Sequence, residues 1–408
     1  MKYGILYNKS NVNVGDDIQA FATARFLPHV DYFIDREHID EFRSDDEEPV
    51  AVIMNAWYMW AKWNWPPSKY IVPKMIGFHY ADHQLAKQPG SPFKYEFLEG
   101  IGGDYLKAYG PIGCRDEFTK SKLAELGIDA YFSGCITLTL PQMPETEDKG
   151  KYICLVDLEP KVIKRMQKIL AKEDIEVRVI THNRERNAEL DWESREKEVV
   201  DLLTIYQNAR CVVTKRLHCA LPCLALGTPV FIIKEMEDDI RFTPYYDFLY
   251  RTTVTKFMNG EYEYDFMNPP ANRELYKPVR EGLIKASEEF VAQMETETRS
   301  TDELVKTSYT EDEVLRWRHD KMKWAMDLWL LKYRELQKTS ASDKKKIAKL
   351  SRDKSVITKE VEAKILKKYE DRVNSIDEKE REIEKLKKQV EMLTKESMVA
   401  HWKRKRKG

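Results

Sequence analysis

Short apolar runs alternate with longer amphipathic stretches through the first three-quarters of the chain. Runs rich in β-branched and aromatic residues predict strands at residues 3–7, 50–55, 75–78, 129–132, 152–156, 177–181, 211–214 and 230–233. Between them, apolar residues at three- and four-residue spacing predict helices at residues 18–26, 117–126, 161–172 and 196–208. Strands that alternate with helices of this length are typical of parallel sheets covered by helices.

A polar segment divides these elements into two sets. Residues 141–150, PQMPETEDKG, contain two prolines and no apolar periodicity, as expected of a linker. We therefore predict an α/β fold with two Rossmann-like domains, over residues 1–145 and 150–297. Two such domains joined by a short linker leave a cleft between them.

The pattern changes after residue 298. Trp and Leu residues at helical spacing within 311–337 predict a helix, so residues 298–342 are expected to form a helical extension that packs on the globular part. The segment 343–408 ends the chain, and apolar residues alternate by three and four at positions 366, 369, 373, 376, 383, 386, 390 and 393. This is coiled-coil periodicity, and we favour a homo-oligomer through this segment over a long solvated helix.

The last residues, HWKRKRKG, place Trp402 beside five consecutive basic residues, 403–407. A solvated tail accounts for this composition. Contact with anionic lipid accounts for it too, at about 1 kcal/mol for each basic residue near the surface. The sequence therefore leaves peripheral attachment at the inner face of a membrane as an alternative.

Composition sets broad limits on the class of protein. Of the 408 residues, 42% are hydrophobic, and 68 basic residues nearly balance 69 acidic ones. This balance gives no global attraction to nucleic acid, which we do not expect as a partner. The first 17 residues lack the apolar core of a signal peptide, and no run approaches the roughly 20 apolar residues of a transmembrane helix. We predict a cytoplasmic protein.

The six cysteines are expected to be buried free thiols. They lie mostly within predicted elements, without paired CxxC spacing, at positions 114, 135, 154, 211, 219 and 223. His218, Cys219 and Cys223 resemble a partial metal site, but thiols in a reducing cytoplasm are the better interpretation. We predict neither a metal nor a cofactor.

The most informative segment is CVVTKRLHCALPCLALGTPVFII, residues 211–233. It predicts a strand, a polar corner with Arg216 and His218, a small-residue helix and a second strand. In open α/β sheets, ligands bind outside the carboxyl ends of the strands, and a helix N-terminus there favours anions. Arg grips a carboxylate or phosphate with two hydrogen bonds, and His carries a proton near neutral pH. The corner therefore predicts an anionic substrate and acid–base chemistry.

Two further clusters lie where a predicted helix begins. In Asn13-Val14-Gly15-Asp16, the aspartate is either a helix N-cap or a functional carboxylate, and the sequence leaves both readings open. In Gly113-Cys114-Arg115-Asp116, the aspartate is a plausible N-cap, which leaves Arg115 to project from the loop as a surface charge or a ligand-binding group.

Taken in order, these segments resemble the polysaccharide pyruvyl transferase family. The resemblance rests on 13–16, on Arg115-Asp116 with Thr119, on Ser133-Gly134-Cys135, and on Thr214–His218 with Gly227-Thr228-Pro229. It covers residues 1 to about 290 and excludes the extension. Many relatives carry Asp-Pro where this chain has Ser133-Gly134, and Ser in place of Thr119. These departures put fine donor contacts in doubt more than the reaction.

The resemblance implies a fold similar to the GT-B glycosyltransferases, with the active site in the interdomain cleft. It further implies transfer of a pyruvyl group from phosphoenolpyruvate to two hydroxyls of a surface polysaccharide or its lipid-linked precursor, as a ketal. Arg115 and Arg216 would bind the donor's carboxylate and phosphate, with Leu217 in the same donor site. His218 would be the general acid, and Asp16 would serve as base or sugar-binding group.

Two more side chains are candidates for substrate contact. His182 follows the strand predicted at 177–181 and is either a ligand contact or a loop histidine without a role. Trp57, the first of the tryptophans at 57, 60, 63 and 65, suits a glycan-stacking platform, although these residues can equally wedge the two domains together. His79 and His83 are taken as structural.

Two other functions compete with the pyruvyl transferase hypothesis. A GT-B glycosyltransferase would bind a nucleotide sugar in its second domain, commonly with a carboxylate near the last strand–helix corner, and four carboxylates lie at 235 and 237–239. A non-catalytic scaffold would use the coiled coil. The joint presence of Asp16, Arg115, Arg216 and His218 argues against the scaffold. The sequence names neither the acceptor sugar nor the ketal stereochemistry.

Overall fold

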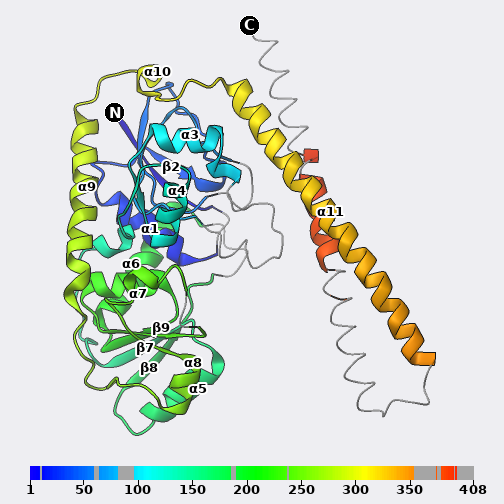
Figure 1. The fold of residues 1–408 in the computed structure, drawn as a ribbon. Coiled ribbons are helices and arrows are strands. Elements are labelled where there is room, and N and C mark those ends of the chain that lie inside the picture. The colour runs from blue at the N-terminus through cyan, green and yellow to red at the C-terminus, as the bar shows by residue number, and fades with distance from the viewer. Residues whose placement is uncertain are drawn as a thin grey trace. The chain divides into compact units, whose positions relative to one another are not determined.

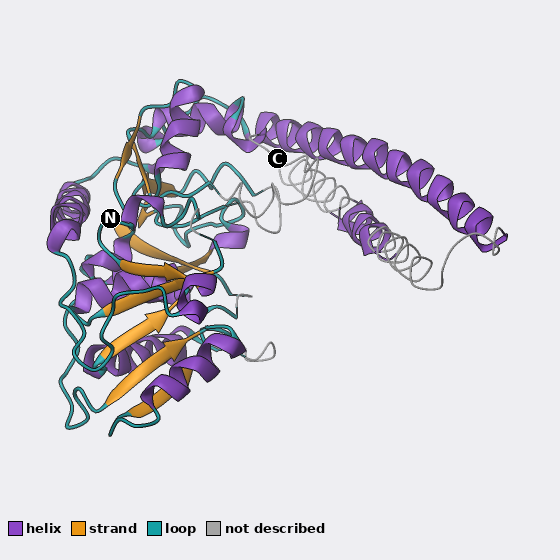
Figure 2. Ribbon diagram, turned by 60° about the horizontal axis from the view of Figure 1, so that its bottom comes forward, coloured by secondary structure: helices purple, strands orange, loops and turns teal. Residues whose placement is uncertain are grey.

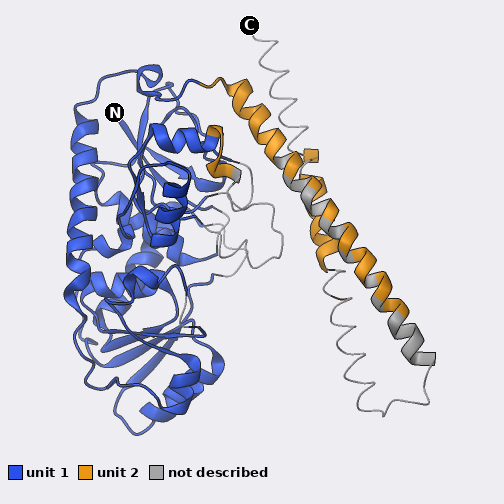
Figure 3. Ribbon diagram, viewed as in Figure 1, with its two compact units in different colours: residues 1–81, 102–308 blue, residues 82–101, 309–408 orange. Residues whose placement is uncertain are grey.

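The computed structural model describes residues 1–9, 12–58, 64–80, 96–184, 190–236, 239–352, 374, 378–389 and 391–392. The chain divides into two compact units (Figure 3). The first comprises residues 1–81 and 102–308, and the second comprises residues 82–101 and 309–408.

The first unit opens with a four-stranded parallel sheet in the order β2-β1-β3-β4. Its strands are β1 (Lys2–Tyr7), β2 (Tyr32–Asp35), β3 (Val50–Ile53) and β4 (Ile71–Lys74). All four residues of β3 are buried, as expected of an inner strand of a parallel sheet. Helix α1 (Val14–Ala24) follows β1 and packs on it (Figure 1).

The strand predicted at 75–78 is wrong by about four residues. The strand ends at Lys74, and Gly77 then adopts a positive φ of 70°, which interrupts extended pairing. Phe78 instead pairs through a single bridge with Cys114 in β5 (Ile112–Cys114). Residues 75–78 are therefore apolar because they are buried, but they form a turn between two sheets instead of a strand.

A second, two-stranded parallel sheet pairs β5 with β6 (Ala130–Phe132). Helix α3 (Ile101–Ala108) precedes β5, and α4 (Glu117–Glu125) connects the two strands. Asp116 is the N-cap of α4, as predicted, because its Oδ1 accepts a hydrogen bond from the backbone N–H of Thr119 at 2.8 Å. The cap fixes the direction in which the preceding loop presents Arg115.

A five-stranded parallel sheet, in the order β11-β10-β9-β7-β8, forms the other half of the first unit. Its strands are β7 (Tyr152–Val156), β8 (Glu176–Ile180), β9 (Cys211–Thr214), β10 (Val230–Lys234) and β11 (Tyr250–Thr253). The helices are α5 (Pro160–Leu170), α6 (Trp192–Asn208), α7 (Leu217–Leu226), α8 (Val254–Asn259) and α9 (Lys277–Glu295). Strands and helices alternate along the chain from β7 to β10, as predicted. Figure 2 shows strands in orange with helices in purple beside them.

Hydrophobic side chains cover both faces of the five-stranded sheet. One cluster joins Ile153 and Phe231 to apolar residues of α5 and α8. The other joins Cys154 to residues of α6 and α7, and it continues into the first sheet through Ile5 and into α9 through Phe290. One core thus connects the two larger sheets, and the domain limits at 145 and 150 stay a prediction. All six cysteines are buried and free.

The first unit ends with the short helix α10 (Thr301–Leu304), and the second unit is mainly helical in its described part. Helix α11 runs from Glu311 to Arg352 and includes the helix predicted at 311–337. Its start is attached to the segment at 96–101, since the Tyr309 hydroxyl donates to the Ile101 carbonyl at 3.3 Å. No helix among the described residues is long and apolar enough to cross a membrane.

Most of the predicted coiled coil falls outside the described residues. Of its apolar positions, only 383 and 386 belong to the part of the chain described, and both are helical. The basic residues 403–407 and Trp402 lie outside it as well. Self-association and contact of the tail with lipid therefore stay predictions.

Candidate functional site

Backbone hydrogen bonds bring the start of α1 to the end of β8. The N–H of Val14 donates to the carbonyl of His182 at 2.9 Å, and the N–H of Arg184 donates to the carbonyl of Val12 at 2.7 Å. At Gly15 a Cβ would lie 3.1 Å from the Cβ of His218. Glycine therefore permits the close approach of the first turn of α1 to the first turn of α7.

Asp16 is not the N-cap of α1. The cap is Asn13, whose side chain accepts a hydrogen bond from the N–H of Gly15 at 3.1 Å. The carboxylate of Asp16 is 8% exposed; it pairs with Nη1 of Arg36 at 3.3 Å and accepts from Nε2 of Gln19 at 3.3 Å. Of the two readings that the sequence left open, the structure excludes the N-cap, and the functional role of Asp16 stays a prediction.

Arg115 is buried, with 3% of its surface exposed, so it is not a surface charge. Its backbone is held on both sides, because its N–H donates to Phe78 and its carbonyl accepts from the Tyr245 hydroxyl at 2.7 Å. Its Nη1 lies 3.4 Å from Nε2 of His218 and 3.5 Å from Oε1 of Gln19. Among the described atoms, its buried Nε has no hydrogen-bond partner.

His218 stands in the first turn of α7 with a non-helical backbone, at φ −79° and ψ 16°. Pro222 has no N–H to donate to the His218 carbonyl four residues earlier, so the helix is not held regular at this point. Nδ1 of His218 lies 3.5 Å from Nε2 of Gln19, and Nε2 lies 3.8 Å from the sulfur of Cys135. The corner predicted from the sequence therefore faces α1 and the loop after β6.

The surroundings of His218 disfavour its protonated form. Although part of its surface stays accessible, burial by the protein holds the pKa of His218 well below 6.5, and the charges of Arg115 and Arg241 add to the effect. The ring is then neutral at neutral pH and has one lone pair. Gln19 and Arg115 nevertheless present a donor nitrogen to each ring nitrogen, so one donor lacks an acceptor on the ring.

Arg216 lies beside this cluster and is partly exposed. It occupies the N-cap position of α7 without a capping hydrogen bond from its side chain. Its Nε donates to Oδ2 of Asp157 at 2.9 Å, and its Nη2 donates to Oδ1 of Asn183 at 3.2 Å. About a third of its side chain, 32%, reaches the surface. Burial alone would raise the pKa of Asp157, but hydrogen bonds from His182 and Thr181, together with Arg216, hold it below its ordinary value. Arg216 is thus oriented by a carboxylate.

The remaining predicted site residues have different surroundings. The side chain of Leu217 is buried in the core, at 6% exposure. His182 is buried, and its Nε2 lies 2.8 Å from the hydroxyl of Tyr206. Trp57 is half-buried, with the guanidinium of Arg36 at 5.2 Å from its ring centre. The structure therefore brings Asp16, Arg115 and His218 together, with Arg36 connecting Trp57 to Asp16.

The tryptophans at 57, 60, 63 and 65 do not share one environment. Trp65 is fully buried, and its indole N–H donates to the carbonyl of Gly102 at 3.2 Å, so this tryptophan belongs to the core. Trp60 and Trp63 lie outside the described residues, as does His83. His79 is buried, and its Nδ1 lies 2.5 Å from Oδ2 of Asp116; burial lowers the pKa of His79 to about 4.

Four residues of the cluster were not predicted as site residues: Gln19, Asn55, Cys135 and Arg36. Gln19 lies three positions after Asp16, a spacing that puts both on one face of α1. Asn55 follows β3, where ligand-binding residues of α/β sheets gather. Cys135 belongs to the Ser-Gly-Cys segment already noted. Helical spacing and strand ends were therefore available as signals for the first two.

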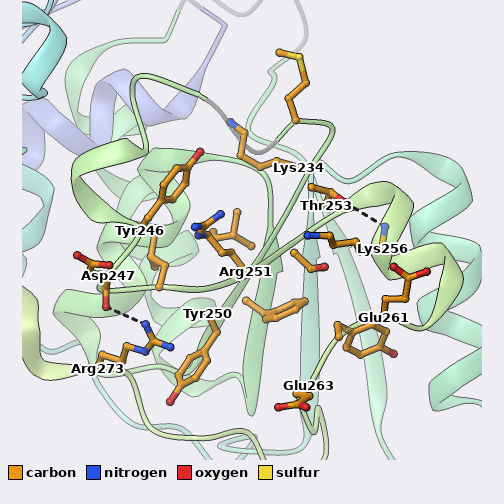
Figure 4. Close-up of a pocket in the computed structure, with 16 residues that line it drawn as sticks. Lys234, Tyr246, Asp247, Tyr250, Arg251, Thr253, Lys256, Glu261, Glu263 and Arg273 are labelled. Atoms are coloured by element: carbon orange, nitrogen blue, oxygen red, sulfur yellow. Dashed lines mark hydrogen bonds between the residues drawn. The ribbon is translucent and has the colours of Figure 1, made fainter.

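A separate pocket of about 710 Å³ lies beside β11, and Figure 4 shows Arg251 between Tyr246 and Lys256 in it. The guanidinium of Arg251 stacks 4.0 Å from the ring centre of Tyr246, and that of Arg273 lies 4.9 Å from the ring centre of Tyr250. Three carboxylates also line it, those of Asp247, Glu261 and Glu263. None of the predicted site residues lines this pocket.

The family model for polysaccharide pyruvyl transferases matches residues 13–235, more than half of the 408 residues. The chain belongs to the polysaccharide pyruvyl transferase family. This confirms the family predicted from the ordered segments, and the match includes Asp16, Arg115 and the Arg216–His218 corner.

The solved structures that match this pyruvyl transferase family member do so at low sequence identity and low TM-score. An uncharacterised protein of Klebsiella pneumoniae is 13% identical over 62% of this chain and 93% of its own, with a TM-score of 0.35. UDP-GlcNAc 2-epimerase of Methanocaldococcus jannaschii is 11% identical over 73% and 100%, with a TM-score of 0.41. MnaA of S. aureus, solved with UDP, is 10% identical over 76% and 99%, also with a TM-score of 0.41. No curated protein matches the chain.

Proposed function

We propose that this protein transfers a pyruvyl group from phosphoenolpyruvate to a sugar of a surface polysaccharide or its precursor, forming a pyruvate ketal. Membership of the family supports transfer to a polysaccharide in general. One observation carries the choice of an anionic donor: the buried guanidinium of Arg115 faces His218 with its hydrogen-bonding capacity incompletely used.

A bound anion would supply the hydrogen-bond acceptor that Arg115 lacks. A buried guanidinium stays protonated, and burial without acceptors is costly. A carboxylate or phosphate oxygen near Arg115 and Nε2 of His218 would accept hydrogen bonds from both. Phosphoenolpyruvate offers both kinds of oxygen, so Arg115 and the partly exposed Arg216 would hold the two ends of the donor. Leu217 would contribute only through its backbone, since its side chain is in the core.

The same binding event would prepare His218 for acid catalysis. In the free protein its pKa is well below 6.5, mainly because of burial, and negative charge from the donor would raise this pKa. The imidazolium would then give its proton to the methylene carbon of the donor. One acceptor hydroxyl adds to the adjacent carbon and gives its proton to a base, proposed below as Asp16, from which the proton returns to His218 through solvent. A second hydroxyl displaces phosphate from the same carbon and its proton leaves with the phosphate, which yields the ketal and hydrogen phosphate.

Asp16 is proposed as the base or the sugar-binding group. Its side chain pairs with Nη1 of Arg36 at 3.3 Å and accepts from Nε2 of Gln19 at 3.3 Å, which holds it at the start of α1. His182 would support the site through its backbone, which binds both α1 and Asp157. Trp57 would contact the acceptor at the edge of the same cluster. We propose a cytoplasmic protein without a cofactor, self-associated through the C-terminal helices and held near the membrane by the basic tail.

Calorimetry with phosphoenolpyruvate tests the donor. We expect binding by the wild type, loss of binding in Arg115→Met and weakened binding in Arg216→Ala. Arg251→Ala in the separate pocket is the matched control and should bind as the wild type does. If the wild type gives no binding heat, the donor assignment is wrong.

The pocket beside β11 favours a second candidate, a nucleotide-sugar glycosyltransferase. Tyr246 and Tyr250 supply aromatic faces, and Asp247, Glu261 and Glu263 supply carboxylates that can accept hydrogen bonds from ribose hydroxyls. Titration of a nucleotide-sugar panel against the wild type and Tyr246→Ala separates the two functions. Nucleotide-sugar binding lost in Tyr246→Ala, without phosphoenolpyruvate binding, would favour this alternative. Binding of neither compound would favour a scaffold.

A further inference from the structure

The segment 239–246, which follows β10, is folded around the carboxylate of Asp239. This carboxylate accepts hydrogen bonds from Nε and Nη2 of Arg241 at 3.1 and 2.8 Å, and it also pairs with Nζ of Lys234. The backbone carbonyl of Asp239 accepts from the N–H groups of Phe242 and Thr243 at 2.8 and 3.1 Å. Burial alone would raise the pKa of Asp239, but Arg241 and Lys234 hold it well below its ordinary value. A charged carboxylate therefore fixes the direction of the Arg241 guanidinium.

This segment adjoins the corner that carries Arg216 and His218. Because β9 and β10 are adjacent parallel strands, the segments that follow them leave the sheet at the same edge. The hydroxyl of Tyr245 donates to the carbonyl of Arg115 at 2.7 Å, so the segment also contacts the loop after β5. Burial and the charge of Arg115 are the main causes of the low pKa of His218, and the charge of Arg241 is a further cause. Arg241 therefore acts on the same site as Arg115.

Arg241 is held in the same manner as Arg216. In each residue Nε and Nη2 donate to protein oxygens, and about a third of the side chain is exposed, 34% in Arg241 and 32% in Arg216. Among the described residues, Nη1 of each has no hydrogen-bond partner. A guanidinium oriented in this way keeps the hydrogens of Nη1 for an anion from solution.

The site needs a further positive charge if its ligand is a phosphate ester. Such an ester carries about 1.5–2 negative charges at neutral pH, and the carboxylate of phosphoenolpyruvate adds to this. Asp157 offsets the charge of Arg216, with which it pairs at 2.9 Å. Lys234 and Arg241 together share a single carboxylate, so they keep a net positive charge. Arg241 thus brings to the site a charge that its own partner does not cancel.

We propose that Arg241 is a third donor-binding residue, which holds the phosphate of phosphoenolpyruvate together with Arg115 while Arg216 holds the carboxylate. The phosphate carries the larger charge, so it fits the two guanidiniums that act on His218 from the loops after β5 and β10. Hydrogen bonds from both would also stabilise the phosphate as it leaves. The departure of this phosphate rests on the proposed function, whereas the binding of a phosphate by Arg115 and Arg241 does not.

Calorimetry with two probes, phosphoenolpyruvate and inorganic phosphate, tests this assignment. We expect Arg241→Met to weaken the binding of both by about 10- to 10²-fold, the size expected when a charge-assisted hydrogen bond is lost. Arg241→Lys, which keeps the charge but not the planar fork, should recover part of the loss. Arg216→Ala should weaken the binding of phosphoenolpyruvate and leave the affinity for phosphate nearly unchanged. An equal loss for both probes in Arg216→Ala would overturn the assignment of the two ends.

Arg178→Met is the matched control. Nε and Nη2 of Arg178 donate to Glu176 at 2.8 and 2.9 Å, and 29% of its side chain is exposed, but it lies within the edge strand β8 instead of after the carboxyl end of a strand. This variant should bind both probes as the wild type does. Tyr245→Phe removes the hydrogen bond to Arg115 and keeps Arg241, so it tests whether the segment acts only by supporting Arg115. We expect a much smaller loss of affinity than in Arg241→Met.

Far-UV circular dichroism establishes that each variant is folded. Unchanged affinity for both probes in Arg241→Met, or an equal loss in Tyr245→Phe, would overturn the proposal. If the wild type binds phosphate but not phosphoenolpyruvate, the proposed function fails, and the comparison of Arg241→Met with Arg178→Met still decides the phosphate site by itself. Binding of neither probe by the wild type would overturn both.

Discussion

Two buried arginines on either side of the first turn of α1 are used in different ways. Arg195 is 2% exposed and Arg115 is 3% exposed. Every side-chain nitrogen of Arg195 has a protein acceptor: Nη1 pairs with Asp17 at 3.2 Å, and Nε and Nη2 donate to backbone carbonyls at 3.1 and 2.8 Å. Arg115 instead faces an imidazole, and its Nε has no partner among the described atoms.

The contrast separates a structural clamp from a binding site. Asp17, which follows Asp16 in the sequence, is held by Arg184 as well as Arg195, and together they attach α1 to residues of the second half of the first unit. Removing one partner of such a pair leaves a buried charge behind. Around Arg115 the pairing is incomplete, so substitution there should affect ligand binding more than folding.

The largest effect on stability is expected for Arg195→Met. The change leaves Asp17 with Arg184 as its remaining guanidinium and removes the hydrogen bonds to three backbone carbonyls, so the free energy of unfolding should fall by about 3–5 kcal/mol. Urea denaturation followed by circular dichroism measures the loss. Lys197→Met, which breaks an exposed pair with Asp201, is the control and should cost at most about 1 kcal/mol. Equal losses in both variants would mean that the buried clamp contributes no more to stability than an exposed ion pair.

Arg115→Met, unlike Arg195→Met, should weaken ligand binding and leave stability nearly unchanged. We expect phosphoenolpyruvate affinity to fall by about 10²–10³-fold, as for removal of a charged donor from a catalytic site, with a change of less than about 1 kcal/mol in the free energy of unfolding. Calorimetry and urea denaturation of one preparation measure both. A loss of stability as large as that of Arg195→Met, with binding intact, would make Arg115 a second clamp.

Acid should lower the stability that comes from the buried contact between His79 and Asp116. Burial lowers the pKa of His79 to about 4 from 6.5, so the unfolded chain binds more protons than the folded one between these pH values. The contribution of neutral His79 to the free energy of unfolding is therefore complete above pH 6.5. It is lost as the pH falls toward 4, by up to about 3 kcal/mol at 1.36 kcal/mol per pH unit.

Denaturation of the wild type and His79→Gln at pH 7 and pH 5 measures this loss. The variant should depend less on pH than the wild type, while His38→Asn, a change at a half-exposed histidine, should follow the wild type. A wild-type stability that rises on acidification would contradict the sign of the effect.

Sequence patterns predicted some residues of this site but not the contacts that these residues make with one another. Arg216 and His218 were predictable because they follow an apolar strand and precede a helix, where α/β sheets bind ligands. The burial of Arg115 was not, because it depends on Tyr245 and Phe78, which are distant in the sequence. Gln19 and Asn55 likewise acquire their roles only when α1, β3 and the loop before Ile136 meet.

Arg216 should behave as an intermediate case between the two arginines. It is oriented by Asp157 yet keeps a third of its side chain exposed. Arg216→Lys retains the charge but loses the planar fork, so we expect the KM for phosphoenolpyruvate to rise about tenfold with little change in stability. Asp157→Asn should raise it less, since the guanidinium stays but is less firmly oriented. A larger effect from Asp157→Asn would make the carboxylate, and not Arg216, the important group.

The smallest effect is expected at Trp57, which Arg36 connects to Asp16 and which we propose to contact the acceptor. The Arg36 guanidinium stacks on its ring at 5.2 Å, an interaction worth about 0.5–1 kcal/mol when partly exposed. Trp57→Leu should therefore lower stability by no more than that, and it should raise the KM for the glycan acceptor about 3- to 10-fold while the KM for phosphoenolpyruvate stays unchanged.

Steady-state kinetics with each substrate varied in turn separate the two constants. Trp65→Leu is the control for a tryptophan of the core: because Trp65 is fully buried, it should lose about 3–5 kcal/mol of stability without selective loss of acceptor binding. If Trp57→Leu instead raises both constants equally, its ring positions Arg36 and Asp16 for the donor, and the acceptor must bind elsewhere along the cluster.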